Sequence, residues 1–381
     1  MQAASESTLA GSNGIVADSS LSLQTAGEAH SVAALLTLGR AAIAQHDYSA
    51  AIGYLARAES LAGADDPIPG RLLNRVIRRL VPRWHFAMIN DHRRNAAYEA
   101  AIAATVRPGD LVLDIGTGSG LLALLAAQAG AGLVISCEAE PVIADVARQI
   151  VAANGYQDRV RVVDGLSTNL RVGVDLPAPA DVLVTEIFDC GLLGENVLPT
   201  VEHARRELLA DGARILPGRA RLWGQLVSSD NIRSHNYVST ACGFDVSTFN
   251  QFRSLEYFDT YLENYPHQAL TSPFPLLDVD FNVDCPPARE VIKAVPAANG
   301  DCDAIAIWFE LDLAPGVSLS TGPEQRGNHW RQAIQTFDVP FRCETGRPVA
   351  LQVQHDRERV LVMADGDLAP PPARGTVDFM M

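Results

Sequence analysis

The sequence predicts an α/β protein in which an α-helical segment precedes a doubly wound parallel sheet and an antiparallel β domain follows it. Strand and helix patterns alternate over 108–216, an order typical of parallel sheets. Within this region the apolar run 111–115 ends in a glycine-rich turn that leads into an Ala/Leu-rich helical pattern. Beyond Ala220 the pattern changes to short strands between Gly, Pro and Asn turns, namely 221–227, 304–313 and 349–353.

The glycine-rich turn predicts a nucleoside site. Glycines at Gly116 and Gly118 let the backbone approach a ligand closely because no Cβ intervenes. The next strand ends in Glu138, about 20 residues further on, where a carboxylate would accept the hydroxyls of a ribose. Asp114 precedes the glycines and no Arg or Lys is nearby, so a cationic, phosphate-free nucleoside suits the turn better than NAD. S-adenosylmethionine fits that description.

A second motif follows the strand 182–185, which runs into a glycine-containing loop between Glu186 and Glu195, nine residues apart. Here the chain resembles the protein arginine methyltransferase family, whose "double-E" loop has this spacing. The resemblance covers roughly 84–340. Its other motifs are His85 to Asn95, Ser320-Thr321-Gly322-Pro323 and Asn328-His329-Trp330, and the loop wording Thr-Glu-Ile-Phe-Asp is most like the monomethylating, type III branch.

The two loop glutamates are the expected clamp for a guanidinium group. A guanidinium is a poor nucleophile because its charge and lone pairs are delocalised. Two carboxylates that bind its N–H groups would localise the charge on the far nitrogens and aim one nitrogen at the methyl group. Glu186 and Glu195 are assigned this role. The structural alternative is that Glu186 caps the following segment and Glu195 is a surface residue.

The resemblance implies further site residues. Asp91 and His329 would form a hydrogen-bonded pair that accepts or relays the proton lost on methylation. Arg94 matches the arginine that meets the cofactor's carboxylate. Taken alone, His329 is more typical of a structural histidine. Other positions that the family places around the cofactor or acceptor are His85, Met88, Ser167, Glu186 and Trp330; Ser167 stands where many relatives have an acidic residue, and Met88 could equally fill the core.

Asp189 lies three residues after Glu186, as in the type III branch, where other branches have a small residue. A bulkier, acidic group there should crowd the acceptor nitrogen and disfavour a second methyl group. The predicted product is therefore an ω-N-monomethylated guanidine.

Composition limits the partners and the location. The chain has 381 residues, a hydrophobic content of 48% and a formal net charge of -15, which argues against nucleic-acid binding and permits a cationic substrate. It has no apolar run of about 18 residues and no basic-then-apolar N-terminal pattern, so no membrane association and a cytoplasmic location are expected. The six cysteines form no Cys-x-x-Cys pair, which predicts no metal site.

The predicted organisation has four parts. A disordered tail covers 1–28, and a helical segment covers 29–83, in which Leu38-Gly39 and Ala51-x-x-Tyr54-x-x-x-Ala58 resemble one tetratricopeptide repeat. The S-adenosylmethionine-binding domain covers 84–217 and the β domain 218–381. By resemblance, the β domain is a barrel and its segment of about 237–275 is a dimerisation arm, which implies a homodimer.

Two acceptors fit the motifs: free L-arginine, and an arginine in a protein or peptide. Family resemblance favours the second. The arginine- and alanine-rich composition, typical of high-GC bacterial genes, and the single catalytic module favour free arginine, as in natural-product pathways that begin from N-methylarginine. Two other classes are a non-catalytic scaffold, which the intact glycines and glutamates oppose, and a methyltransferase with a non-guanidine acceptor, which would leave the clamp carboxylates without a task.

Overall fold

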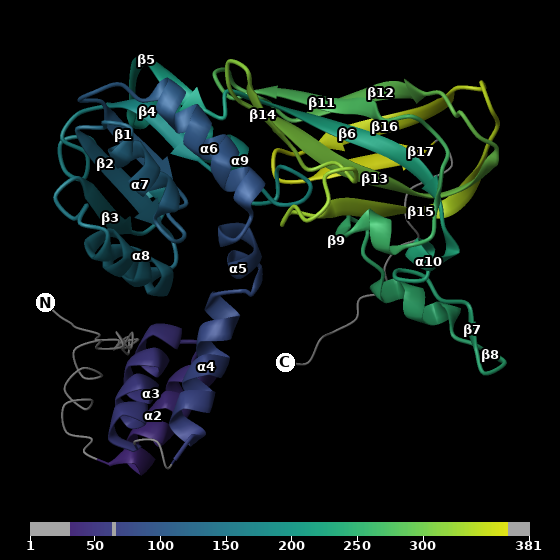
Figure 1. The fold of residues 1–381 in the computed structure, drawn as a ribbon. Helices are drawn as coiled ribbons and strands as arrows, with labels where there is room; N and C mark the ends of the chain where they lie inside the picture. The colour runs from purple at the N-terminus through teal and green to yellow at the C-terminus, as the bar shows by residue number, and fades with distance from the viewer. Residues whose placement is uncertain (1–30, 63–65, 365–381) are drawn as a thin grey trace, which may run out of the picture. The chain divides into compact units, whose positions relative to one another are not determined.

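A computed structural model describes residues 31–62 and 66–364 (Figure 1). The predicted tail 1–28 lies outside the described residues. The chain divides into two compact units, of which the first ends at Pro82 and the second begins at Arg83. In the described ranges, no helix has both the length and the apolar character needed to cross a membrane.

Within residues 31–62 and 66–82, the N-terminal unit contains the helices α2 (Val32–Ala44), α3 (Tyr48–Ala62) and α4 (Ile68–Leu80). Ser31 caps α2, since its Oγ accepts a hydrogen bond from Ala34 N at 3.2 Å. Gly39 allows α2 and α3 to touch, because a Cβ there would lie 2.8 Å from Leu55 Cδ2. The predicted helices are therefore present, and their tetratricopeptide character stays a prediction.

The second unit begins with a five-stranded sheet of order β3-β2-β1-β4-β5 in which every pair is parallel. Its strands are β1 (Leu111–Ile115), β2 (Leu133–Glu138), β3 (Val160–Asp164), β4 (Ala180–Thr185) and β5 (Leu209–Leu216). The helices around it are α5 (Trp84–Ile89), α6 (His92–Thr105), α7 (Leu121–Gln128), α8 (Pro141–Ala153), η1 (Ser167–Asn169) and α9 (Val197–Glu207). All five residues of β1 are buried, as expected for a central strand covered on both faces.

The β domain is built on a seven-stranded and a three-stranded antiparallel sheet, which share one hydrophobic core. The seven-stranded sheet contains β6 (Arg219–Ser228), β9 (Phe258–Thr260), β10 (Gln268–Ala269), β11 (Phe274–Asp280), β13 (Gly300–Ala314), β14 (Val317–Ser320) and β15 (Gln332–Cys343). The other contains β12 (Ala288–Ala294), β16 (Val349–His355) and β17 (Val360–Ala364). Gln335 joins the sheets, because its amide exchanges two hydrogen bonds with the backbone of Val362, at 2.5 and 2.9 Å. The expected barrel takes this two-sheet form.

The segment 237–275 has little regular structure and an apolar surface. After α10 (Asp230–Arg233), it comprises the hairpin of β7 (Thr240–Ala241) and β8 (Phe244–Asp245), then η2 (Ser247–Phe252), β9, η3 (Leu262–Asn264), β10 and the start of β11. Phe244, Phe249 and Phe252 are all exposed in it. Strand β9 fixes the base of the segment by pairing with β15.

Candidate active site

The glycine-rich turn joins β1 to α7 and has the backbone that only glycine adopts easily. Gly116, Gly118 and Gly120 have φ angles of 88°, 51° and 80°. A Cβ on Gly116 would lie 2.6 Å from Ile187 Cγ2, so the turn packs directly against the glutamate loop. Glu138 stabilises the turn from β2, since its Oε2 accepts a hydrogen bond from Gly118 N at 2.9 Å.

Two alanine substitutions should separate backbone strain from steric overlap in this turn. Gly118→Ala meets only Met88 Cε at 3.7 Å, so we expect the left-handed backbone alone to cost about 1 kcal/mol. Gly116→Ala adds the overlap with Ile187, and we expect about 2 kcal/mol or more. Urea unfolding measures both values; equal losses would show that Ile187 moves aside freely.

Asp114 lies beneath the turn and is fully buried. Its Oδ2 accepts a hydrogen bond from Ser136 Oγ at 2.6 Å, and Ser136 in turn contacts Thr117 at 2.6 Å. Its Oδ1 has no hydrogen-bond partner among the described residues. Burial raises the pKa of Asp114 to about 7 despite the hydrogen bond from Ser136. An unpaired buried oxygen below an open glycine turn is consistent with the predicted nucleoside site.

The other predicted cofactor residues lie at different depths. Met88 in α5 is buried and faces Gly118, whereas His85 is half-buried and stacks on Trp84 with ring centroids 3.8 Å apart. Ser167 is buried in η1, which lies beside α9. Met88 therefore lies closest to the turn, and the cofactor roles of His85 and Ser167 stay predictions.

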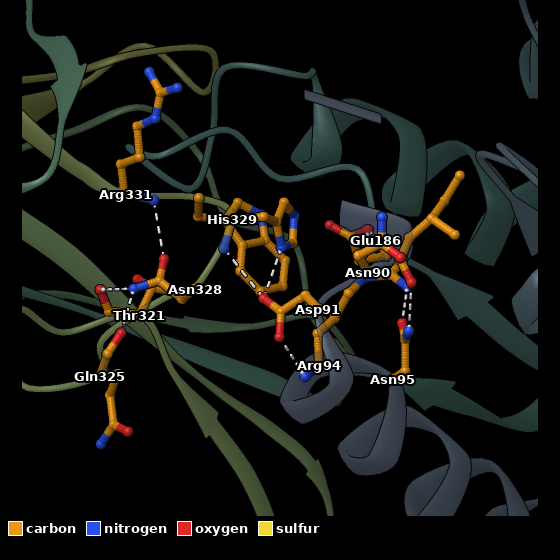
Figure 2. Close-up of polar contacts among 12 residues, drawn as sticks. Asn90, Asp91, Arg94, Asn95, Glu186, Thr321, Gln325, Asn328, His329 and Arg331 are labelled. Carbon is orange, nitrogen blue, oxygen red and sulfur yellow. Dashed lines mark hydrogen bonds and ion pairs between the residues drawn. The ribbon is translucent and has the colours of Figure 1, made fainter. Parts of the chain in front are cut away.

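Arg94 and Glu186 form a buried ion pair, which no motif in the sequence indicates. Nε and Nη2 of Arg94 donate to Oε2 of Glu186 at 3.1 and 2.5 Å (Figure 2), with side chains only 5% and 4% exposed. Burial opposes the charge of Arg94, but Glu186 keeps the pKa of Arg94 above its usual value. Both bonds converge on one oxygen, so Arg94 leaves Oε1 of Glu186 unengaged.

Asp91 and His329 meet as predicted, from opposite ends of the second unit. Asp91 caps α6 through a 3.0 Å bond from Arg94 N to Oδ1. Its Oδ2 accepts two bonds of 3.1 Å, from the backbone N and from Nδ1 of His329 (Figure 2). Burial would raise the pKa of Asp91, but the bonds from His329 and Arg94 lower it to about 2. The carboxylate therefore stays charged and fixes the imidazole.

The segment before β15 supports this pair and the glutamate loop together. Asn328 is buried, and its side chain bonds Gln325 O and Arg331 N at 2.9 Å each (Figure 2). Trp330 is also buried, and its indole N–H donates to Phe188 O, within the glutamate loop, at 2.9 Å. Trp330, predicted to bind substrate, thus holds the loop; a contact with the acceptor stays a prediction.

Glu195 ends the loop in strongly acidic surroundings. The side chain reaches solvent, yet partial burial among protein atoms raises its pKa to about 8, with further contributions from Glu186, Asp189 and Glu138. Such a concentration of carboxylates around one loop favours a cationic ligand. Unlike Glu186, Glu195 forms no ion pair with any other residue that the structure describes, so it is available to a cationic ligand.

Asp189 has a role that the sequence did not reveal. Its Oδ1 accepts from Gly194 N at 2.8 Å and its Oδ2 from Tyr257 Oη at 2.7 Å, while Arg359 Nη1 lies 4.0 Å away. Tyr257 and Arg359 were missed because no motif or spacing marks them. The carboxylate braces the loop, and crowding of the acceptor by Asp189 stays a prediction.

A glycine turn on a parallel sheet, an adjoining loop with two glutamates, and a bonded aspartate–histidine pair are together what a methyltransferase with a cationic acceptor requires. Comparisons with known proteins agree. Residues 96–219 match the family model "Ribosomal protein L11 methyltransferase (PrmA)", and residues 219–365 match "Arginine methyltransferase oligomerization subdomain".

Curated relatives give the family. Arginine N(omega)-methyltransferase of Streptomyces achromogenes subsp. streptozoticus is 44% identical over 279 residues, covering 73% of this chain and 77% of the relative. Protein arginine N-methyltransferase 7 of Cricetulus longicaudatus is 33% identical and protein arginine N-methyltransferase 9 of Xenopus laevis 32%, over 71% and 68% of this chain. The chain spans only 44% and 35% of the length of these last two. It belongs to the arginine methyltransferase family, so the predicted family and enzyme class are confirmed.

Solved structures agree on the fold. A Trypanosoma brucei PRMT1 enzyme–prozyme heterotetrameric complex with AdoHcy superposes with a TM-score of 0.64 at 24% identity, covering 72% of this chain and 89% of that one. Arabidopsis thaliana protein arginine methyltransferase 10 gives 0.58 at 23% identity, covering 70% and 86%. The predicted order of a parallel-sheet domain and an antiparallel β domain is thereby confirmed.

Proposed function

We propose that the protein transfers a methyl group from S-adenosylmethionine to an ω-nitrogen of free L-arginine. The observation that carries this proposal is the placement of Glu186 and Glu195 on one loop that packs against the glycine turn through Ile187. The open backbone at Gly118, the carboxylate of Glu138 and the unpaired Oδ1 of Asp114 suit an adenosine-bearing sulfonium. When bound, that group supplies an electrophilic methyl group and departs as a neutral thioether.

The loop carboxylates orient the acceptor. Oε1 of Glu186 and the side chain of Glu195 would bind the N–H groups of the guanidinium, which localises positive charge on the bonded nitrogens. The remaining nitrogen then regains a lone pair and faces the methyl group in line. Arg94 holds the Glu186 side chain in place through its two bonds to Oε2.

The aspartate–histidine pair accounts for the proton that the methylated nitrogen loses. Because Oδ2 of Asp91 accepts from Nδ1 of His329, the neutral imidazole carries its proton on Nδ1 and leaves Nε2 as the acceptor. Asp91, with its lowered pKa, would also stabilise the imidazolium that forms.

Free arginine is favoured over a peptide by the name of the relative that is 44% identical and covered over 77% of its length. The 44% identical Streptomyces protein is named arginine N(omega)-methyltransferase, whereas the relatives named protein arginine methyltransferases are 31–34% identical over a smaller part of their length. Protein or peptide arginine is the second candidate. The type III resemblance of the loop supports monomethylation, and the exposed phenylalanines of 237–275 support a homodimer.

Mass spectrometry tests the proposal directly. Purified protein with S-adenosylmethionine is incubated with L-arginine in one tube and with an arginine-rich peptide in another. We expect L-arginine to gain one methyl group and the peptide none. Methylation of the peptide alone would make this a protein-modifying enzyme, and cofactor binding without methylation of any guanidine would support the scaffold alternative. Dimethylarginine at full turnover would contradict monomethylation.

The raised pKa of Glu195 predicts the pH dependence. Only the carboxylate binds a guanidinium, and the pKa of Glu195 in the free enzyme is about 8. Below that pH, kcat/KM for L-arginine should rise about tenfold per pH unit, and it should level off above it. Initial rates between about pH 6 and pH 9 measure this limb; a flat profile would mean that the Glu195 carboxylate does not bind the acceptor.

A further inference from the structure

The end of the glutamate loop that carries Glu195 is contacted from the β domain by Tyr257, at the base of the 237–275 segment. Tyr257 directly precedes β9, which pairs with β15 and so belongs to the seven-stranded sheet. Its hydroxyl donates to Asp189 Oδ2 at 2.7 Å, and Asp189 Oδ1 accepts from Gly194 N at 2.8 Å. Gly194 is the residue before Glu195, so the chain of bonds ends at the acceptor-binding glutamate.

The packing around this contact is as close as its hydrogen bonds. A Cβ on Gly191 would overlap the ring of Tyr257, and one on Gly194 would overlap Asp189 and Arg359. Neither glycine has a positive φ angle, so close approach, not backbone strain, is what requires glycine at these positions. The loop is therefore shaped around the tyrosine ring and the aspartate.

Charged groups surround the contact between Asp189 and Tyr257, and the Tyr257 hydroxyl stays protonated. Arg359 Nη1 lies 4.0 Å from Asp189, and its Nε bonds Glu256 at 3.1 Å. Burial and the neighbouring Asp189 hold the pKa of Tyr257 far above its usual value, so its hydroxyl remains a donor. The charges of Glu186 and Glu138 also act on Glu195 and, with that of Asp189, raise its pKa.

We propose that Tyr257 is a positioning residue for methyl transfer, which holds the acceptor-binding end of the glutamate loop in place through Asp189. The assignment rests on the proposed function of Glu195 as half of the guanidinium clamp. It also gives the 237–275 segment a direct mechanical link to the catalytic loop, within the same chain.

Tyr257→Phe keeps the ring on Gly191 and removes only the hydroxyl. We expect kcat/KM for L-arginine to fall about tenfold, mainly through KM, because the acceptor loses a well-placed carboxylate. The matched control is Tyr237→Phe, which removes the 2.6 Å bond from Tyr237 to Asp338 in the same segment, away from the loop. The control should stay within about twofold of wild type. Affinity for S-adenosylhomocysteine, measured by calorimetry, should be unchanged in both.

The pH dependence of kcat/KM distinguishes a positioning role of Tyr257 from a general loss of order in the glutamate loop. Asp189→Asn removes a negative charge beside Glu195, so the acidic limb of kcat/KM should move to lower pH by roughly half a unit. Tyr257→Phe removes a donor that partly neutralises Asp189, so the limb should move to higher pH. Gly191→Ala displaces the ring and should lower kcat/KM as Tyr257→Phe does. Variants indistinguishable from Tyr237→Phe would overturn the proposal.

A readout without turnover separates this proposal from the proposed function. The titration of Glu195 in the free enzyme is followed by ¹³C NMR of glutamate carboxyls, with Glu195→Gln identifying the signal. A shift of the Glu195 titration in Tyr257→Phe, but not in Tyr237→Phe, supports the positioning role of Tyr257 even if no guanidine is methylated. An unshifted Glu195 titration in Tyr257→Phe overturns this role even if the wild-type protein methylates arginine.

Discussion

Glu186→Gln is expected to abolish most methyl transfer, with kcat for L-arginine about 10²- to 10³-fold lower. The neutral amide keeps the shape of the side chain but no longer stabilises charge on the bound guanidinium. It also leaves Arg94, only 5% exposed, with a neutral partner. We therefore expect the free energy of unfolding to fall by about 2 kcal/mol, since a buried cation loses its counterion.

Cofactor affinity is the measurement that distinguishes this variant from a misfolded one. Arg94 is predicted to bind the carboxylate of S-adenosylmethionine. In the variant, the neutral amide at position 186 competes less than a carboxylate for the Arg94 guanidinium. Calorimetry with S-adenosylhomocysteine should give a Kd no weaker than that of wild type. Glu310→Gln is a matched control, because Glu310 accepts a 2.9 Å bond from Trp223 Nε1 in the β domain. Wild-type kcat in Glu186→Gln would contradict the clamp.

The parts of the site that local sequence determines were predictable. The glycines at 116 and 118 have positive φ angles because a tight strand-to-helix turn demands them, and that demand is visible in the residue types alone. Glu138 ends β2 and Glu186 directly follows β4, so the parallel arrangement of the strands places both at the carboxyl edge of the sheet. Family motifs supplied the distant pairing of Asp91 with His329.

The contacts that join distant segments without a motif were not predictable. Arg94 and Glu186 are 92 residues apart in the chain. The sequence predicts a different role for each, namely binding of the cofactor's carboxylate and of the guanidinium. Trp330 bonds the backbone of Phe188, and a backbone acceptor leaves no mark in the sequence. Tyr257 could be any aromatic residue of its segment until the fold brings it onto Gly191. Packing in three dimensions, not residue type, decides these roles.

Asp91→Ala is expected to destabilise the second unit strongly. It removes the cap of α6 and both bonds to His329, which tie the parallel-sheet domain to the segment before β15. A lost cap costs about 1 kcal/mol and charge-assisted bonds somewhat more, so we expect about 3 kcal/mol in all. All four tryptophans lie beyond residue 83, so their fluorescence in urea reports on this unit alone.

Asp91→Ser separates the two functions of the carboxylate. A serine hydroxyl can still cap α6 but cannot reach His329, so the loss of stability should fall to about 2 kcal/mol. The same kcat defect, about 10²-fold, should remain in both variants because the imidazole is no longer fixed. Recovery of kcat in Asp91→Ser would show that the cap alone matters and that His329 needs no partner.

Acid titration supplies an independent measure of the same contact. The pKa of Asp91 is lowered from 3.8 to about 2 in the folded chain, so its carboxylate stabilises the fold above about pH 4 and loses that effect as the pH falls towards 2. The shift corresponds to about 2 kcal/mol. The difference in unfolding free energy between wild type and Asp91→Ala should therefore narrow by about that amount over this range. A difference that stays constant with pH would mean that the bonds to Asp91 do not depend on its charge.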